Sequence, residues 1–150
     1  MLAGKNLAMS LLDNKTGMLW GSFMPVLKQI KHRVSDNLYS LQDYPATYFD
    51  IYNPGTVFTN WALTEVSTRD VLPEGMKHFK LEGGLYAVFL HRGSDTDTST
   101  YQYIFSTWLP QSDYVLDHRP HFELLGSRYK KGDDNSEEEF WIPVKEKQKA

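Results

Sequence analysis

Apolar side chains recur along the chain with two different periods, and these periods predict its secondary structure. A β-strand is predicted where apolar and polar residues alternate, or where about four to eight apolar residues run together, because successive strand side chains point to opposite faces. Strands are predicted at residues 6–12, 44–52, 61–67, 77–81, 85–91, 121–129 and 140–144. Pro143 in the last of these favours an edge position, since proline has no backbone N–H to donate.

Two helices are predicted from apolar residues that recur at spacings of three and four. The stripe of the first helix, from about residue 15 to residue 35, consists of Trp20, Phe23, Leu27, Ile30 and Val34. Such spacing places the side chains on one side of a helix. Pro25 lies inside this segment and predicts a kink near residues 22–24, because it removes a backbone hydrogen bond. The second helix is predicted at residues 101–109 and ends at Pro110.

Each half of the chain has the predicted element order strand, helix, strand, strand. The first set spans about residues 5–68 and the second about residues 84–145, which leaves residues 146–150 as a charged tail. A chain of 150 residues is in the range of a single domain with a substantial core. The predicted fold is therefore α+β, a duplicated unit of antiparallel strands with one helix per repeat. The two sheets are expected side by side, with a ligand cleft between the repeats.

Composition and charge narrow the range of functions. The formal net charge is −3 and no stripe of lysine and arginine is visible, so direct binding of nucleic acid is not expected. The chain has no cysteine, which excludes disulfides, a thiol nucleophile and thiolate metal ligands. No apolar run is long enough to span a membrane and no signal-peptide pattern begins the sequence, so a cytoplasmic location is expected. The histidines form neither an HxH nor an HExxH pattern, so no metal site is predicted.

Glu123 is the charged residue that stands out from its surroundings. It occupies the centre of a short, mostly apolar segment, His121-Phe122-Glu123-Leu124-Leu125. Alternation places His121, Glu123 and Leu125 on one strand face. A carboxylate on such a face is either at the solvent edge or held in a cavity, where burial without a partner would cost several kcal/mol. A cavity acid therefore needs a hydrogen-bond donor, a cation or a proton.

A high density of aromatic residues upstream favours a cavity around Glu123. The candidate ligand-binding residues are Glu123, Trp108, Tyr101, Phe89, Trp61 and His121. Tyr101 and Trp108 are seven positions apart and share one face of the second helix. Aromatic faces can hold a cation or a flat ring while a carboxylate supplies charge. Core packing of the rings, exposure of Glu123 and a structural role for His121 are the alternatives left open.

Four blocks in the second half occur in a familiar order and spacing. They are GLYAVF at 84–89 followed by HRG at 91–93, WLP at 108–110 followed by Ser112 and Tyr114, RPHFE at 119–123, and FWIPV at 140–144. Together they resemble the GyrI-like small-molecule-binding domains of bacteria, which also form the effector-binding domains of AraC-type and multidrug-sensing regulators. The resemblance covers the first half of the chain by element order only. It implies a duplicated strand-helix-strand-strand fold with a ligand cleft between the repeats.

For Glu123 the resemblance implies a place in an aromatic-lined cleft that faces cationic, lipophilic ligands. The expected function is cofactor-free binding of a lipophilic, cationic or aromatic small molecule. Two alternatives stay open: a cofactor-free hydrolase of reactive cyclopropane-containing xenobiotics, with Glu123 as the catalytic acid, and a protein inhibitor of DNA gyrase. Regulators of the family carry a separate DNA-binding domain that these residues do not provide. A homodimer or another protein partner also stays open.

Overall fold

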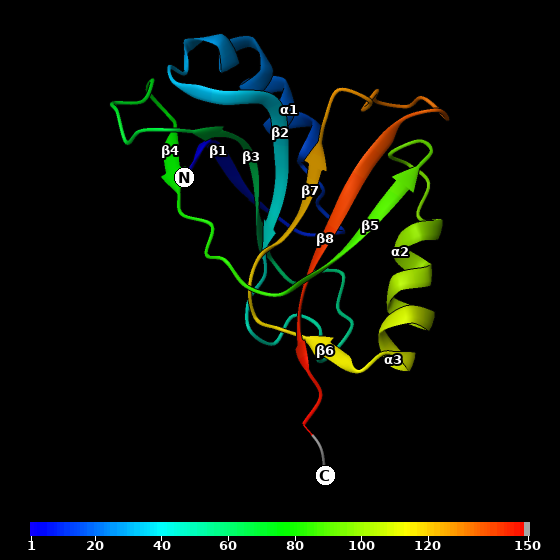
Figure 1. Ribbon diagram of the computed structural model, residues 1–150. Coiled ribbons are helices and arrows are strands. Elements are labelled where there is room, and N and C mark those ends of the chain that lie inside the picture. The colour runs from blue at the N-terminus through cyan, green and yellow to red at the C-terminus, as the bar shows by residue number, and fades with distance from the viewer. Residues whose placement is uncertain (149–150) are drawn as a thin grey trace.

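The strands of the chain form one antiparallel sheet in the computed structural model, which describes residues 1–148 (Figure 1). They are β1 (Leu2–Met9), β2 (Arg33–Asp43), β3 (Phe58–Val66), β4 (Lys77–Phe79), β5 (Tyr86–Arg92), β6 (Tyr114–Leu116), β7 (His121–Leu125) and β8 (Glu137–Glu146). The sheet is eight-stranded and follows the order β4-β1-β3-β2-β7-β8-β5, while β6 pairs with the end of β8. Strands β2 and β7 therefore lie at its centre.

Two helical segments pack against this sheet. The first is α1 (Thr16–Phe23) with the 3-10 helix η1 (Met24–Gln29), and the second is α2 (Ser99–Tyr103), the π-helical η2 (Ile104–Trp108) and α3 (Leu109–Gln111). Leu19 and Phe23 of α1 are buried in a core with Ala62 of β3. Ile104 of η2 is buried in a second core with Phe140 of β8. Within residues 1–148, no helix combines the length and apolar character needed to span a bilayer.

The predicted α+β architecture with a duplicated element order is confirmed. The first half contributes β1, α1, β2 and β3, the second half contributes β5, α2, β7 and β8, and β4 and β6 are additional short strands. The halves join through antiparallel pairing of β2 with β7, in which Ser40 is opposite Glu123. The two predicted sheets are therefore one continuous sheet, because the central strands of the halves hydrogen-bond to each other.

A third core lies on the opposite face of the sheet. Its buried residues are Leu2, Leu41, Trp61, Leu63 and Phe122. Leu81, in the connector between β4 and β5, packs against them. Figure 1 shows this connector running from β4 at one edge of the sheet to β5 at the other. The connector therefore covers the face that carries no helix.

The first helix is shorter than predicted, and the strand that follows it was not predicted. Helix α1 ends at Phe23 because Pro25 cannot donate an α-helical hydrogen bond, and the chain tightens into η1. Residues 33–35, which were predicted to be helical, instead begin β2. The first part of β2 is mostly exposed, and its pairing with β3 is irregular between Arg33 and Leu38. Because this part is mostly exposed, its sequence does not alternate between apolar and polar residues as a half-buried strand does.

The strand predicted at residues 44–52 and the edge position predicted for the last strand are both wrong. Residues 44–52 form turns between β2 and β3, with hydrogen bonds from the Tyr48 amide to the Pro45 carbonyl and from the Asp50 amide to the Thr47 carbonyl. Pro143 does not mark an edge strand, because β8 lies between β7 and β5. The pairing of β8 with β7 stops before Pro143. No backbone N–H is therefore needed at Pro143 for hydrogen bonds to β7. Of the predicted charged tail, residue 146 belongs to β8, and residues 149–150 lie outside the described residues.

Arg119 fastens the connector to the end of β8. Its Nη2 atom donates to the Leu85 carbonyl at 2.5 Å and to the Val144 carbonyl at 3.3 Å. Its Nε atom donates to Asp117 Oδ2 at 2.7 Å, and this hydrogen bond lowers the pKa of the Asp117 carboxyl. The guanidinium also lies 4.6 Å from the centre of the Tyr86 ring. One side chain therefore ties together three segments that are distant in the sequence.

We expect Arg119→Ala to lower the free energy of unfolding by about 2 kcal/mol, because several acceptors lose a charged donor. Urea denaturation followed by tryptophan fluorescence measures the change. Arg69→Ala is the matched control, since the Arg69 residue is exposed. Equal denaturation midpoints for the two variants would contradict this role for Arg119.

Candidate functional site

A cross-strand row of side chains connects the two helical segments. Ala62 of β3 is paired with Ser40 of β2, Ser40 with Glu123 of β7, and Glu123 with Phe140 of β8. Directly paired residues point to the same face of a sheet. Because α1 covers Ala62 and η2 covers Phe140, Ser40 and Glu123 lie on the floor between the helical segments. This floor is the junction of the two halves of the chain.

Aromatic side chains gather around this floor. We define the aromatic cluster as Tyr44, Tyr48, Phe49, Phe58, Tyr101, Phe105 and His121. The Phe49 ring stacks against Phe105, with 5.9 Å between centroids, and against His121, with 5.1 Å between centroids. These rings come from the segment after β2, from the start of β3, from the second helical segment and from β7. The tertiary fold therefore brings together residues that are far apart in the sequence.

Glu123 lies beside this cluster and is held by a tyrosine. The Tyr101 hydroxyl donates to Glu123 Oε1 at 2.6 Å, and the Tyr101 ring stacks on Phe140 with 4.2 Å between centroids. Burial raises the pKa of the Glu123 carboxyl above its usual value, and the Tyr101 hydrogen bond opposes this rise. Burial also raises the pKa of Tyr101, with the Glu123 charge as the next cause, so the phenol stays a donor at neutral pH.

His121 and Tyr44 adjoin Glu123 as neutral groups. Burial lowers the pKa of His121 to about 4, so its imidazole carries no charge at neutral pH. His121 therefore cannot supply a cation to Glu123 and instead presents its ring to Phe49 and Tyr44. Burial raises the pKa of Tyr44, and the charges of Tyr48 and Glu123 contribute in the same direction. The Tyr44 ring packs edge-on against the His121 ring, with 5.1 Å between centroids.

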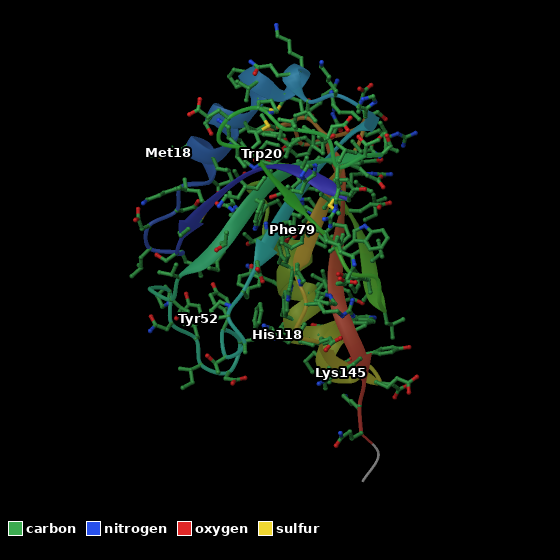
Figure 2. All side chains as sticks on the ribbon, turned by 90° about the vertical axis from the view of Figure 1, so that its left-hand side faces the viewer. Met18, Trp20, Tyr52, Phe79, His118 and Lys145 are labelled. Carbon is green, nitrogen blue, oxygen red and sulfur yellow. The ribbon has the colours of Figure 1, made fainter. Side chains whose placement is uncertain are left out.

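A cavity of about 300 Å³ opens onto the aromatic cluster. It is lined by Leu11, Tyr44, Tyr48, Phe49, Tyr52 and Asn53. Tyr44 and Phe49 form the wall shared with His121, whereas Tyr52 is 83% exposed at the rim. Figure 2 shows Tyr52 at the same end of the molecule as His118, whose Nε2 lies 3.3 Å from the Tyr44 carbonyl oxygen. The cavity therefore opens at this end of the molecule and shares Tyr44, Tyr48 and Phe49 with the aromatic cluster, whereas Glu123 is not among its lining residues.

Glu138 is a second buried acid, and sequence reasoning missed it. The residue is 5% exposed and points to the same face of β8 as Phe140. Burial, followed by the charges of Glu123 and Asp95, raises the pKa of Glu138 to about 8. No strand was predicted at residues 131–138, which are mostly polar. Extending the alternation of Phe140 and Ile142 back by two positions would have placed Glu138 on the buried face.

The remaining predicted site residues lie elsewhere. Phe89 is paired with Phe140, and its ring contacts Trp108 with 5.0 Å between centroids, so these residues fasten η2 to the sheet behind Phe140. Trp61 is in the core on the opposite face, 5.0 Å from Phe79 by ring centroids. The structure therefore does not bring Trp61 to Glu123, because alternation along β3 turns it away.

The site combines an acid with neutral aromatic faces. Such an arrangement attracts cations, through the carboxylate and through the negative faces of the rings. No set of three or more His, Asp or Glu side chains within residues 1–148 is placed to hold a metal ion. The chemistry available at the floor is therefore that of Glu123, the Tyr101 hydroxyl and the rings around them.

Comparisons with known proteins place these features in a family. A family model described as GyrI-like small molecule binding domain matches residues 2–145. An integron cassette protein from the mobile metagenome of Vibrio cholerae has a similar structure, with a TM-score of 0.64 and 16% identity, covering 96% of this chain and 89% of that chain. SAV2435, whose structure was solved with bound tetraphenylphosphonium, is similar with a TM-score of 0.59 and 15% identity, covering 96% of this chain and 87% of that chain. No curated protein matches the sequence.

Proposed function

The chain belongs to the family of GyrI-like small molecule binding domains, and we propose that it binds a lipophilic, cationic or aromatic ligand against Glu123 and the aromatic cluster. The observation that carries the proposal is the contact between the Tyr101 hydroxyl and Glu123 beside a set of stacked rings. This contact leaves Glu123 Oε2 available to a positive charge. The tetraphenylphosphonium bound by the similar SAV2435 has the chemistry that such a site favours.

The size of the cavity indicates how a ligand would enter. Its volume of about 300 Å³ is at the lower end for small-molecule pockets. The Phe49 ring separates this cavity from Phe105 and His121, and Phe49 is 46% exposed in a segment without regular structure. A ligand larger than the cavity would therefore displace Phe49 and replace its stacking contacts with its own rings.

The proposal predicts that Glu123→Gln weakens the binding of tetraphenylphosphonium by about 10-fold, because the cation loses a charge that is only partly screened at a half-buried site. Glutamine keeps the shape and can still accept the Tyr101 hydrogen bond. Isothermal titration at neutral pH gives the dissociation constants. Glu65→Gln is the matched control, because Glu65 is on the face of β3 that also carries Trp61. Equal affinities of wild type and Glu123→Gln would overturn the proposal.

A hydrolase is the second candidate, because burial raises the pKa of Glu123, which favours a role in proton transfer, and the Tyr101 hydroxyl lies 2.6 Å from Glu123 Oε1. A reactive cyclopropane-containing compound, incubated with wild-type protein, distinguishes the two functions. Product that accumulates beyond one equivalent, and that is absent with Glu123→Gln, would support hydrolysis. A stable complex at one equivalent, with the compound recovered unchanged, would support binding alone.

A further inference from the structure

Strand β5 forms one edge of the sheet, and this edge is unprotected. It pairs with β8 on one side, and within residues 1–148 no strand pairs with its other side (Figure 1). It contains neither proline nor lysine, and no bulge interrupts it. Edge strands are usually short, charged or bulged, because an open edge can pair with another chain. The opposite edge follows this rule, since β4 has three residues and begins with Lys77.

The backbone groups at this edge are set by the pairing of β5 with β8. The Val144 amide donates to the Leu85 carbonyl at 3.1 Å. In an antiparallel pair, residues that exchange hydrogen bonds alternate with residues that do not. Every second residue from Leu85 onward therefore directs its N–H and C=O groups to β8. Val88 and Leu90 belong to the other set, whose backbone groups point away from the sheet.

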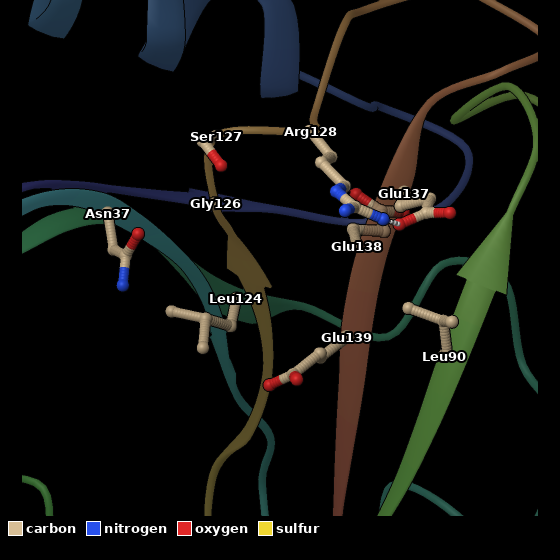
Figure 3. A pocket seen from close by; sticks show the side chains of 9 residues that line it. All are labelled: Asn37, Leu90, Leu124, Gly126, Ser127, Arg128, Glu137, Glu138 and Glu139. Atoms are coloured by element: carbon tan, nitrogen blue, oxygen red, sulfur yellow. Dashed lines mark hydrogen bonds and ion pairs between the residues drawn. The ribbon is translucent and has the colours of Figure 1, made fainter.

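The side chains of Val88 and Leu90 make this edge apolar. Val88 is 45% exposed and Leu90 is 58% exposed. Alternation along β5 places both on the face without helices, opposite to Phe89, which packs beneath η2. Leu90 also borders a hollow of about 290 Å³ with Leu124 and Glu139 (Figure 3). All residues that line this hollow come from β2, β5, β7, β8 and the loop after β7, so the connector leaves this end of β5 uncovered.

The second helical segment leaves room beside this edge. Trp108 contacts Phe89 of β5 on one side of the segment. Tyr101 contacts Glu123 of β7 on the other side, so the segment is centred over β8, the strand between them. Two copies paired along β5 would have their β8 strands three strand spacings apart, or about 14 Å. Helices pack with their axes about 8–10 Å apart, so the helical segments of the two copies would not clash.

We propose that the protein forms a dimer in which the β5 strands of two copies pair antiparallel about a twofold axis. The register that pairs β5 along its whole length has Phe89 at the axis and places Val88 opposite Leu90 of the partner subunit. Symmetry repeats this contact, so apolar side chains that are exposed in one copy cover each other in the dimer. This self-complementarity indicates a second copy of the chain as the occupant of the edge.

The charges and the position of β5 agree with this arrangement. In the same register Arg92 is opposite Tyr86 of the partner subunit, so no like charges meet across the axis. The inference does not rest on the proposed function, because β8 separates β5 from β7, which carries Glu123. Each copy would keep its own aromatic cluster.

Sedimentation velocity over a range of micromolar concentrations tests the dimer. Wild type should pass from monomer to dimer as its concentration rises. Leu90→Lys should raise the dissociation constant at least about 10-fold, because it places a charge against Val88 of the partner subunit. Val71→Lys is the matched control and should dimerise as wild type does, since Val71 is 99% exposed and lies between β3 and β4. Urea denaturation should give equal midpoints for the two variants, because both replaced side chains are exposed.

Engineered cysteines test the register, since the chain has no cysteine of its own. Directly opposite residues of an antiparallel pair have Cα atoms within the distance that a disulfide spans. An equimolar mixture of Val88→Cys and Leu90→Cys should therefore give disulfide-linked dimers on mild oxidation, several-fold more than either variant alone.

Each outcome decides for or against the proposed dimer. Wild type that sediments as a monomer at all concentrations overturns it, and so does a dimer that persists in Leu90→Lys. Cross-linking of either cysteine variant alone that is as efficient as in the mixture overturns the register. Dimers that are lost in Leu90→Lys, kept in Val71→Lys and cross-linked mainly in the mixture support pairing through β5.

Discussion

Replacing Glu138 with glutamine should raise the free energy of unfolding at about pH 9 by on the order of 3–5 kcal/mol, with little change at about pH 4. Burial and the charges of Glu123 and Asp95 raise the pKa of Glu138 from 4.5 to about 8. The unfolded chain ionises this carboxyl near its ordinary pKa, whereas the folded protein keeps it protonated up to about pH 8. Stability is therefore fully present below the unfolded pKa and is lost as the pH rises through the folded pKa. Glutamine cannot ionise and avoids this loss.

Urea denaturation at several pH values measures this effect, with tryptophan fluorescence as the signal. Glu138→Gln should keep part of the wild-type pH dependence, because the pKa of Glu123 is also raised. Glu139→Gln is the matched control, one position along β8 on the opposite face. Parallel stability curves for wild type and Glu138→Gln between about pH 5 and about pH 9 would show that Glu138 ionises normally in the folded protein.

This stability loss has an electrostatic origin. A carboxyl that is costly to ionise in the empty protein becomes favourable to ionise once a cation lies against it. Because Arg92 and Arg128 are engaged by Glu137, no basic side chain of this segment removes the cost in advance. The charge of an ionised Glu138 therefore stays uncompensated in the folded protein.

The sequence predicted the acid at the centre of the site but not the rings that contact it. Glu123 was identifiable because a charge interrupts a short apolar strand, which is a local signal. Phe49 and Tyr44 carry no such signal, since their alternation with polar neighbours is equally compatible with an exposed strand. Only the turns after β2 direct these two rings against His121. Local periodicity cannot report a contact between segments that are so far apart along the chain.

The fold was predictable as an element order and less so in its boundaries. Spacings of three and four continued past the end of the helix because Val26, Leu27 and Ile30 pack on the same core in or after a 3-10 turn, whereas Val34, the last residue of the predicted stripe, is exposed on β2. Strand β2 was hidden because its first residues extend beyond regular pairing with β3. A central strand normally shows a strong pattern of apolar residues, but β2 does not. The single continuous sheet depends on β2, so it could not be predicted from the sequence.

Trp61→Ala should lower the free energy of unfolding by about 3–5 kcal/mol and leave the affinity of the folded protein for tetraphenylphosphonium unchanged. Trp61 is 8% exposed and packs with Leu63, Phe122 and Phe79 on the face without helices. Truncation leaves a large cavity in that core. Ligand affinity should not respond, because the sheet itself lies between Trp61 and the aromatic cluster.

Denaturation and ligand titration on the same samples separate stability from binding for this residue. Trp61→Leu provides a milder variant that keeps most of the core filled, so binding can be measured on fully folded protein. Phe105→Leu is the matched comparison within the aromatic cluster, where loss of the ring that stacks on Phe49 should weaken binding more than it lowers stability. A fall in affinity for Trp61→Leu, with the denaturation midpoint preserved, would mean that the ligand reaches the other face of the sheet.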